Sequence, residues 1–231
     1  MLTVAIIGAG PLGRWLALAT ARAGVPSDRS TSLGWGAGFR VLLEDVMPAN
    51  LHHAQEYIRE QFKDKSCSRN AGPSTPVAAA TSAQDDNFVG NAQDDIVLRA
   101  QNDSILSVTF VSTIEDAVRE ADLAIDCVPD ELESKLEILW LLDRMAPPRT
   151  VLATPTTRLS IADLANCTCR PDKCIAIAQE AASLAAGAGS EILLRATSRT
   201  SPETVALVED FWRQLGFTPR FELDPAEQTV S

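Results

Sequence analysis

Apolar segments alternate with segments of helical periodicity along most of this chain. The apolar run over Leu2–Ile7, in which Thr3 is the one polar residue, is typical of a buried strand. Further strands are predicted over 39–45, 105–111, 122–128, 150–154, 173–178, 190–196 and 217–223. Helices are predicted over 14–23, 47–62, 114–121, 129–145, 160–166 and 201–215. This alternation predicts an α/β fold with a doubly wound, mostly parallel sheet.

Two polar segments interrupt the alternation. Residues 25–38 are rich in glycine and serine and join the first helix to the second strand. Residues 63–104 form a polar excursion in which Ala-Gln-Asp-Asp occurs twice, at 83–86 and 92–95. Apolar residues at 96–100 could pair with the strand at 105–111 as a hairpin. We interpret the whole chain, 1–231, as a single domain with these two insertions.

A glycine motif follows the first predicted strand directly. Residues 8–13 read Gly-Ala-Gly-Pro-Leu-Gly, and a helix is predicted immediately afterwards. Gly8 permits a tight turn, Gly10 leaves room for a pyrophosphate, and Gly13 lets the helix lie close to the strand. The alternative is a glycine turn that binds nothing. We favour a Rossmann-type domain whose helix N-terminus binds the phosphates of a dinucleotide. The predicted contacts are Gly8, Gly10, Pro11, Leu12 and Gly13.

The second predicted strand ends in two acidic residues, Glu44 and Asp45. A carboxylate here accepts hydrogen bonds from the adenine-ribose hydroxyls and repels a 2′-phosphate, which favours NAD over NADP. We assign this role to Asp45, because Leu43 and Asp45 share one strand face while Glu44 points to the other. Asp45 lies 32 residues after Gly13 instead of about 20, and the insertion at 25–38 accounts for the surplus.

Composition narrows the class of protein. The 231 residues are 45% hydrophobic, which is enough for a substantial core, and carry a formal net charge of −11. This charge argues against nucleic acid or an anionic membrane as a partner. The sequence has no 18-residue apolar run, and its N-terminus lacks the basic region of a signal peptide. Five cysteines without regular pairing favour a reducing compartment, so we expect a cytoplasmic protein.

Histidines and cysteines give little indication of a metal site. His52 and His53, the only histidines, have no second ligand at helical spacing, and we expect them to be solvated. The cysteine cluster at 167, 169 and 174 lacks an evident fourth ligand, so no metal is predicted. Cys127 is interpreted as a small buried residue. Asp126, near the end of its predicted strand, is either a functional carboxylate or a hydrogen-bonded structural acid.

Three blocks in the second half of the chain resemble the NAD-binding domain of 3-hydroxyacyl-CoA dehydrogenases. Residues 114–139 read IEDAVREADLAIDCVPDELESKLEIL, residues 152–165 read LATPTTRLSIADLA, and residues 170–177 read RPDKCIAI. The resemblance covers most of the chain outside its two insertions. It implies NAD as cofactor, and the oxidation of the 3-hydroxyl of an acyl-CoA to a ketone in fatty acid metabolism.

The resemblance also implies roles for individual residues. Asp130 and Lys135 match the positions that hold the nicotinamide ribose, and Thr157 matches a hydroxyl that touches substrate and nicotinamide. Pro155 replaces an asparagine that lies near the nicotinamide in the family. The cofactor contacts implied after the fourth strand are Val128, Pro129, Asp130 and Lys135.

The catalytic base of the family is a histidine, and its position here is Ala178. A positioned base contributes roughly 10²–10⁴-fold to such a reaction, and alanine contributes nothing. Glu191 lies close to the position of the glutamate that orients the histidine. Glu180 is a candidate substitute base only if the strand continues to it.

The resemblance leaves three hypotheses open. The first is an NAD-dependent dehydrogenase of a 3-hydroxyacyl-CoA or a smaller hydroxy acid. The second is a catalytically impaired protein that keeps NAD(H) as a sensor or as a subunit of a complex, in which a partner chain supplies the family's C-terminal helical domain. The third is a non-functional gene product. We favour NAD(H) binding with impaired chemistry.

Overall fold

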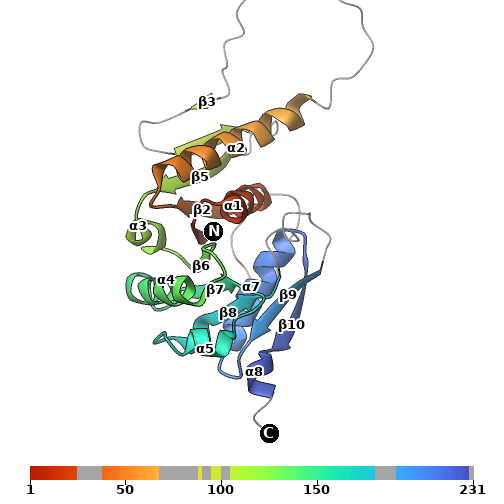
Figure 1. The fold of residues 1–231 in the computed structure, drawn as a ribbon. Coiled ribbons are helices and arrows are strands. Elements are labelled where there is room, and N and C mark those ends of the chain that lie inside the picture. The colour runs from red at the N-terminus through yellow and green to blue at the C-terminus, as the bar shows by residue number, and fades with distance from the viewer. Residues whose placement is uncertain (25–37, 68–87, 90–94, 100–104, 180–190, 229–231) are drawn as a thin grey trace, which may run out of the picture.

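The computed structural model describes residues 1–24, 38–67, 88–89, 95–99, 105–179 and 191–228. Within these residues, ten strands form one sheet in the order β10-β9-β8-β7-β6-β1-β2-β5-β4-β3 (Figure 1). The strands are β1 (Leu2–Ile7), β2 (Phe39–Glu44), β3 (Phe88–Val89), β4 (Asp95–Arg99), β5 (Ile105–Val111), β6 (Leu123–Asp126), β7 (Val151–Pro155), β8 (Cys174–Ile177), β9 (Glu191–Ala196) and β10 (Thr218–Leu223).

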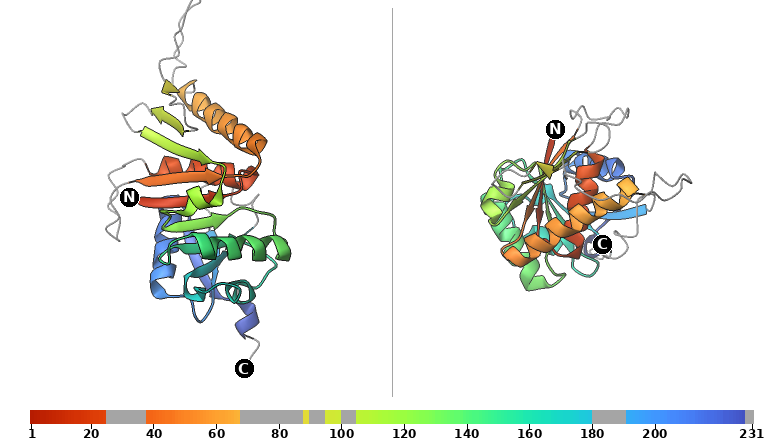
Figure 2. Two further views of the ribbon diagram at one scale, coloured as in Figure 1. Left: turned by 90° about the vertical axis from the view of Figure 1, so that its left-hand side faces the viewer. Right: turned by 90° about the horizontal axis from the view of Figure 1, so that it is seen from above.

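Helices cover both faces of the sheet, as the views from the side and from above show (Figure 2). They are α1 (Pro11–Ala23), α2 (Pro48–Cys67), α3 (Ile114–Val118), α4 (Leu132–Met145), α5 (Ile161–Ala165), α7 (Pro202–Gln214) and α8 (Pro225–Gln228), with a 3₁₀ turn at Pro171–Lys173. Side chains of α1, α2 and α7 pack on one face, and side chains of α3, α4 and α5 pack on the other. The predicted doubly wound α/β architecture is therefore confirmed.

Three strands, β4, β9 and β10, run against the main direction. The strands from β5 through β2, β1, β6 and β7 to β8 are all parallel to their neighbours. β4 pairs with β5 antiparallel, which confirms the predicted hairpin, and β3 pairs with β4 in the same sense. β9 is antiparallel to β8, and β10 is parallel to β9. The sheet is thus mostly parallel, with antiparallel pairings at β8–β9 and in the β3–β4–β5 region.

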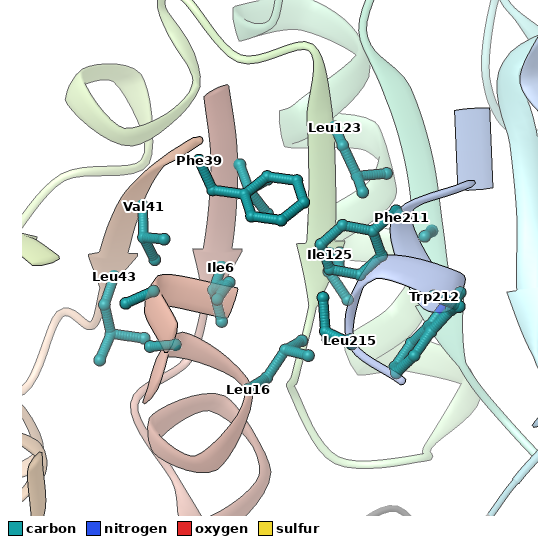
Figure 3. Packing of buried hydrophobic residues seen from close by; sticks show 14 of the residues in the cluster. Ile6, Leu16, Phe39, Val41, Leu43, Leu123, Ile125, Phe211, Trp212 and Leu215 are labelled. Atoms are coloured by element: carbon teal, nitrogen blue, oxygen red, sulfur yellow. The ribbon is translucent and has the colours of Figure 1, made fainter. Parts of the chain in front are cut away.

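The core lies on both faces of the central strands. Ile6 of β1, Val41 of β2 and Ile125 of β6 lie in one hydrophobic cluster with Leu16 of α1 and Phe211 of α7 (Figure 3). On the opposite face, the intervening strand residues pack against α3, α4 and α5. Burial on both faces explains why β1 and β6 are mostly apolar, apart from Thr3 and Asp126, and do not alternate between apolar and polar residues.

Several helix boundaries follow from local chemistry. Thr113 is the N-cap of α3, and its hydroxyl accepts a hydrogen bond from Asp116 N at 3.2 Å. α4 was predicted to begin at Pro129 but begins at Leu132, because Glu131 is extended with φ −121°. Glu131 N instead donates to Pro129 O at 2.8 Å, so residues 129–131 form a turn.

The two insertions are described only in part. Residues 25–37 of the first insertion lie outside the described residues, as do 68–87, 90–94 and 100–104 of the second. α2 extends to Cys67 and so enters the segment predicted to be a polar excursion. The single-domain organisation stays a prediction. Among the described helices, none combines the length and apolar character needed to span a membrane.

The strand order places a crevice at the centre of the sheet. β1 lies between β2 on one side and β6 on the other, so the connections after β1 and after β5 leave the sheet in opposite directions. Ligands of such sheets bind outside the carboxyl ends of the strands at this point of reversal.

Candidate functional site: a crevice at the carboxyl ends of the strands

The crevice occupies about 620 Å³ and follows the carboxyl ends of β1, β2, β6, β7 and β8. This volume lies within the range of small-molecule and cofactor sites. Its lining residues come from the ends of these strands and from the segments that follow them. They are Gly8, Gly10, Pro11, Leu12, Asp45, Asn50, Cys127, Val128, Pro129, Asp130, Pro155, Thr156, Thr157 and Gln179.

The glycine turn forms the first wall, and its glycines have distinct structural roles. Gly8 has φ +100°, a conformation that side chains disfavour, and its N–H donates to Glu44 O at 2.8 Å. A Cβ atom on Gly13 would lie only 1.8 Å from Gly8 O, so the close packing of α1 on β1 requires glycine there. A Cβ atom on Gly10 would meet nothing within 4 Å. Gly10 therefore borders open space, as a residue beside a bound pyrophosphate must.

α1 begins at the crevice with Gly10 as its N-cap and Pro11 in its first turn. No side chain caps this N-terminus, and its first turn contains no acidic residue. Pro11 and Leu12 line the crevice, whereas Gly13 is buried beneath them. The helix thus presents an uncapped N-terminus and its positive dipole end to the crevice, which suits a phosphate.

Asp45 lies at the next wall, directly after β2. It is 8% exposed, and its Oδ2 accepts a hydrogen bond from Ala9 N at 2.8 Å. Its Oδ1 accepts one from Met47 N at 2.8 Å. Asn50 Nδ2 lies 3.1 Å from Oδ1 and 3.0 Å from Oδ2. The carboxylate is therefore held against the glycine turn, at the crevice.

Glu44 does not line the crevice. Its side chain is buried, and among the described residues no group bonds its Oε1. Burial, together with the neighbouring Asp45 carboxylate, raises the pKa of Glu44 to about 7. Of the two acids that end the second strand, Asp45 faces the crevice and Glu44 lies within the fold.

The turn after β6 brings Cys127, Val128, Pro129 and Asp130 to the crevice. Asp130 Oδ2 accepts a hydrogen bond from Thr157 N at 3.2 Å, which joins this turn to the turn after β7. Oδ1 of Asp130 is buried, and no described residue supplies a partner for it. Burial raises the pKa of the Cys127 thiol, so this sulfur is not an activated nucleophile.

Lys135 lies behind this turn and not in the crevice. Its side chain is 0% exposed, and its Nζ lies 2.5 Å from Oδ1 of the equally buried Asp126. The structure therefore separates Lys135 from Asp130, which the sequence resemblance placed together on the nicotinamide ribose. Burial raises the pKa of Asp126, and Lys135 opposes this rise. Of the two interpretations of Asp126, the structure shows the hydrogen-bonded structural acid.

The end of β8 carries the residues expected at the base position. Ala178 N donates to Leu193 O at 2.8 Å, and the next side chain, Gln179, lines the crevice. Thr157 is exposed and lines the same end. Glu191 is exposed at the start of β9, where its Oε1 pairs with Arg220 Nη2 at 2.7 Å. Glu180 lies outside the described residues.

The remaining candidates lie away from the crevice. His52 and His53 are exposed on α2, and His52 Nε2 lies 3.4 Å from Glu56 Oε1. Cys174 is buried beside Thr168, and Cys167 Sγ donates to Leu164 O at 2.8 Å. No group of three metal-ligating side chains occurs in the part of the chain that the structure describes.

Sequence reasoning missed Asn50, Thr156 and Gln179. Asn50 lies in the first turn of α2, five residues after Asp45, and a polar residue at this spacing is the signal that could have found it. Thr156 N donates to Ile177 O at 3.0 Å, which fixes the turn after β7 against β8. Gln179 Oε1 is buried, and no described residue bonds it.

These features fit a dinucleotide. The open space at Gly10 and the uncapped N-terminus of α1 suit a pyrophosphate. Asp45 lies on one side of them and suits a ribose, and the unpartnered Oδ1 of Asp130 on the other side suits a second polar group. The crevice thus has a carboxylate at either side, Asp45 and Asp130, for the ribose hydroxyls. Between them, the N–H groups at the start of α1 can donate to the phosphates.

Comparison with known proteins agrees with this geometry. The family model of the 3-hydroxyacyl-CoA dehydrogenase NAD-binding domain matches residues 3–220. A 3-hydroxybutyryl-CoA dehydrogenase of Clostridioides difficile is 35% identical over 78 residues, which are 34% of this chain and 28% of that protein. The 5-formyl-3-hydroxy-2-methylpyridine 4-carboxylate 5-dehydrogenase of Mesorhizobium japonicum is 23% identical over 94% of this chain and 55% of that protein.

A solved structure shows the same fold. The (S)-3-hydroxybutyryl-CoA dehydrogenase of Ralstonia eutropha superposes with a TM-score of 0.67 at 20% identity, covering 96% of this chain and 63% of that one. In each of these three matches the chain covers less than two thirds of the other protein's length. NAD is the cofactor of the matched domain. From its glycine turn, its sheet order and the match over nearly its whole length, the chain belongs to the 3-hydroxyacyl-CoA dehydrogenase family, of which it represents the NAD-binding domain.

Proposed function

We propose that this chain binds NAD(H) along the crevice and that its dehydrogenase chemistry is impaired. The glycine turn would hold the pyrophosphate, Asp45 the adenine ribose, and Asp130 the nicotinamide ribose. The substrate class would be a 3-hydroxyacyl-CoA or a smaller hydroxy acid, by analogy with the relative named 3-hydroxybutyryl-CoA dehydrogenase. The observation that carries the proposal is the alanine at position 178, where the family has its catalytic histidine.

The loss of the histidine matters because oxidation of an alcohol needs a base. NAD supplies the acceptor for the hydride, and the protein must take the hydroxyl proton. A positioned base typically contributes 10²–10⁴-fold. Among the described crevice residues there is no imidazole, and the side chain after Ala178 is the amide of Gln179, which is not a base at neutral pH. Thr157 keeps a hydroxyl near this end, but a hydroxyl alone orients a substrate and does not take its proton.

Lys135 has a different proposed role from the one that the family resemblance implies. A side chain that is 0% exposed and paired with Asp126 supports the turn from Cys127 to Asp130 from behind. We propose that Lys135 contributes to cofactor binding through the position of Asp130.

A second candidate function is a non-catalytic NAD(H) sensor or a subunit of a complex with a partner chain. The same observation favours it, since the cofactor features are kept while the base position is not. The two functions differ in turnover and agree in nucleotide binding. In the first, slow reduction of a ketone substrate persists. In the second, NADH binds and is not consumed.

Titration of the purified protein with NADH, followed by nucleotide fluorescence, tests the shared part of the proposal. We expect saturable binding that is weakened in Asp45→Ala. Addition of acetoacetyl-CoA to the saturated protein then tests turnover by the loss of NADH absorbance. A wild-type rate that matches that of an intact family member would contradict the proposed impairment.

A gain-of-function variant tests the cause of the impairment. Ala178→His restores an imidazole at the family's base position, and we expect NADH oxidation with acetoacetyl-CoA to rise above the wild-type rate, by up to about 10²-fold. Ala178→Gln is the matched control at the same position, because its amide is not a base at neutral pH, and we expect it not to exceed the wild-type rate. Equal rates for the wild type and Ala178→His would show that the missing imidazole does not limit turnover.

A further inference from the structure

The carboxylate of Asp45 is fully engaged by this chain's own donors. A carboxylate offers about four acceptor positions. Ala9 N and Met47 N take one position on each oxygen, and Asn50 Nδ2 lies within hydrogen-bond distance of both oxygens. A ribose that places its two hydroxyls on Asp45 needs acceptor positions that these donors already fill.

The three donors differ in their freedom to move. Ala9 N belongs to the glycine turn, and Met47 N belongs to the backbone just before α2, so both are fixed by the fold. Asn50 is exposed, lines the crevice and reaches Asp45 with a side chain that has two rotatable bonds. Only the Asn50 amide can leave the carboxylate without a change of backbone.

We propose that the Asn50 amide competes with the adenine-ribose hydroxyls for the carboxylate of Asp45 and thereby lowers the affinity of the crevice for NAD(H). This inference rests on the proposed function, in which Asp45 binds the adenine ribose. Asn50 follows β2, whereas the base position at Ala178 follows β8, so Asn50 would change NAD(H) affinity without touching the base position. The nucleotide must displace the Asn50 amide, so the free energy of the hydrogen bond that is broken reduces the free energy gained from the bonds that the ribose forms.

The expected size of the effect follows from the net value of one hydrogen bond. A hydrogen bond exchanged with water is worth about a two- to tenfold change in an equilibrium constant, and two weak contacts from one amide do not exceed this range. We therefore expect Asn50→Ala to lower the Kd for NADH by about two- to tenfold. The same substitution removes contacts from Asp45, so we expect it to lower the thermal stability of the protein without nucleotide.

Tighter NADH binding together with lower thermal stability distinguishes an Asn50 that competes with the ribose from an Asn50 that only positions Asp45. If Asn50 only positioned Asp45, its loss would weaken both stability and NADH binding. The control is His53→Ala, an exposed residue one helical turn further along α2, for which we expect neither change.

The experiment is a fluorescence titration with NADH of the wild type, Asn50→Ala, His53→Ala and Asp45→Ala, with a thermal unfolding curve of each without nucleotide. Tighter binding by Asn50→Ala than by the wild type supports the inference. An equal or higher Kd for Asn50→Ala, with binding by the wild type that Asp45→Ala weakens, overturns the inference and leaves the proposed function intact. No saturable binding by the wild type, or equal binding by Asp45→Ala, overturns the proposed function itself.

Discussion

Lys135 Nζ lies 2.5 Å from Asp126 Oδ1, and neither side chain is exposed to solvent. Asp126 is the last residue of β6, and Lys135 lies in the first turns of α4, so the pair closes the turn between them from behind. Four consecutive residues of this turn, Cys127 to Asp130, line the crevice. The ion pair therefore fixes the backbone on which part of the site is built.

The losses caused by replacing the two partners of this ion pair should not add. We expect Lys135→Met to destabilise the protein by about 3–5 kcal/mol, because Asp126 is then buried without a cation. We expect Asp126→Asn combined with Lys135→Met to cost less than the sum of the single substitutions. Chemical denaturation of the four proteins measures this coupling. Additive losses would show that the two side chains do not stabilise each other.

The Lys135→Met variant should also show a characteristic pH dependence. Burial raises the pKa of Asp126, and removal of Lys135 takes away the group that opposes this rise. When the pKa of a carboxyl is raised in the folded state, the free energy of unfolding of the protein falls as the pH increases. We therefore expect the deficit of Lys135→Met to shrink as the pH falls toward the ordinary pKa of an aspartate. A deficit that does not change with pH would contradict this account.

Gly13 and Gly10 should respond differently to the same substitution. In Gly13→Ala the new Cβ atom meets Gly8 O at 1.8 Å, so α1 must move away from β1. We expect a loss of both thermal stability and NADH affinity. In Gly10→Ala the new atom points into open space, so we expect nearly unchanged stability and weaker NADH binding. Thermal unfolding and NADH titration of both variants make the comparison.

Glu44 should make the protein less stable as the pH rises from about 4.5 to about 7. In the folded state, burial and the neighbouring Asp45 carboxylate raise the pKa of Glu44 from 4.5 to about 7. In this window the folded protein holds a proton that the unfolded chain has released, so stability falls with pH and levels off above it. The contribution is about 1–3 kcal/mol. The difference in unfolding free energy between wild type and Glu44→Gln, measured across this range, should fall with pH. A constant difference would contradict the raised pKa.

Arg170 should stabilise the end of α4 through its planar guanidinium. Its Nε donates to Asp143 Oδ1 at 2.8 Å, and its other nitrogens donate to the carbonyls of Asp143, Ala146 and Pro147. Lysine cannot reproduce this fork. We expect Arg170→Lys to cost about 1–3 kcal/mol by chemical denaturation. Arg119→Lys is the control on an exposed surface, and a similar loss there would argue against the specific geometry.

The sequence predicts the order of strands and helices well where burial is complete. Leu2–Ile7 and the run before Asp126 are apolar because helices cover both faces, and such runs are recognisable without a structure. The start of α4 was placed too early because Pro129 suits a first helical turn. The extended backbone of Glu131 depends on the turn that carries Asp130, which a local pattern does not reveal.

The candidate site was predictable in part. The roles of Gly8, Gly10 and Gly13 follow from spacing, because each glycine answers a backbone requirement. The burial of Lys135 does not, because its partner Asp126 belongs to a different element and only the packing of α4 brings them together. Asn50 lies only five residues after Asp45, so its spacing was a usable signal, but the contact itself depends on how the chain turns between β2 and α2.

Hydrogen bonds between segments that are far apart in the sequence affect the order in which the site can form during synthesis. Thr3 N donates to Asp122 Oδ2 across 119 residues of sequence, and Ser160 donates to Asp224 across 64. Contacts of such long range require closure of large loops and slow the search for the native state. A nascent chain that emerges N-terminus first exposes its glycine turn early, yet β1 gains its second neighbour only after β6 has been translated. We therefore expect nucleotide to bind only after β6 has been translated, and not to an isolated glycine turn.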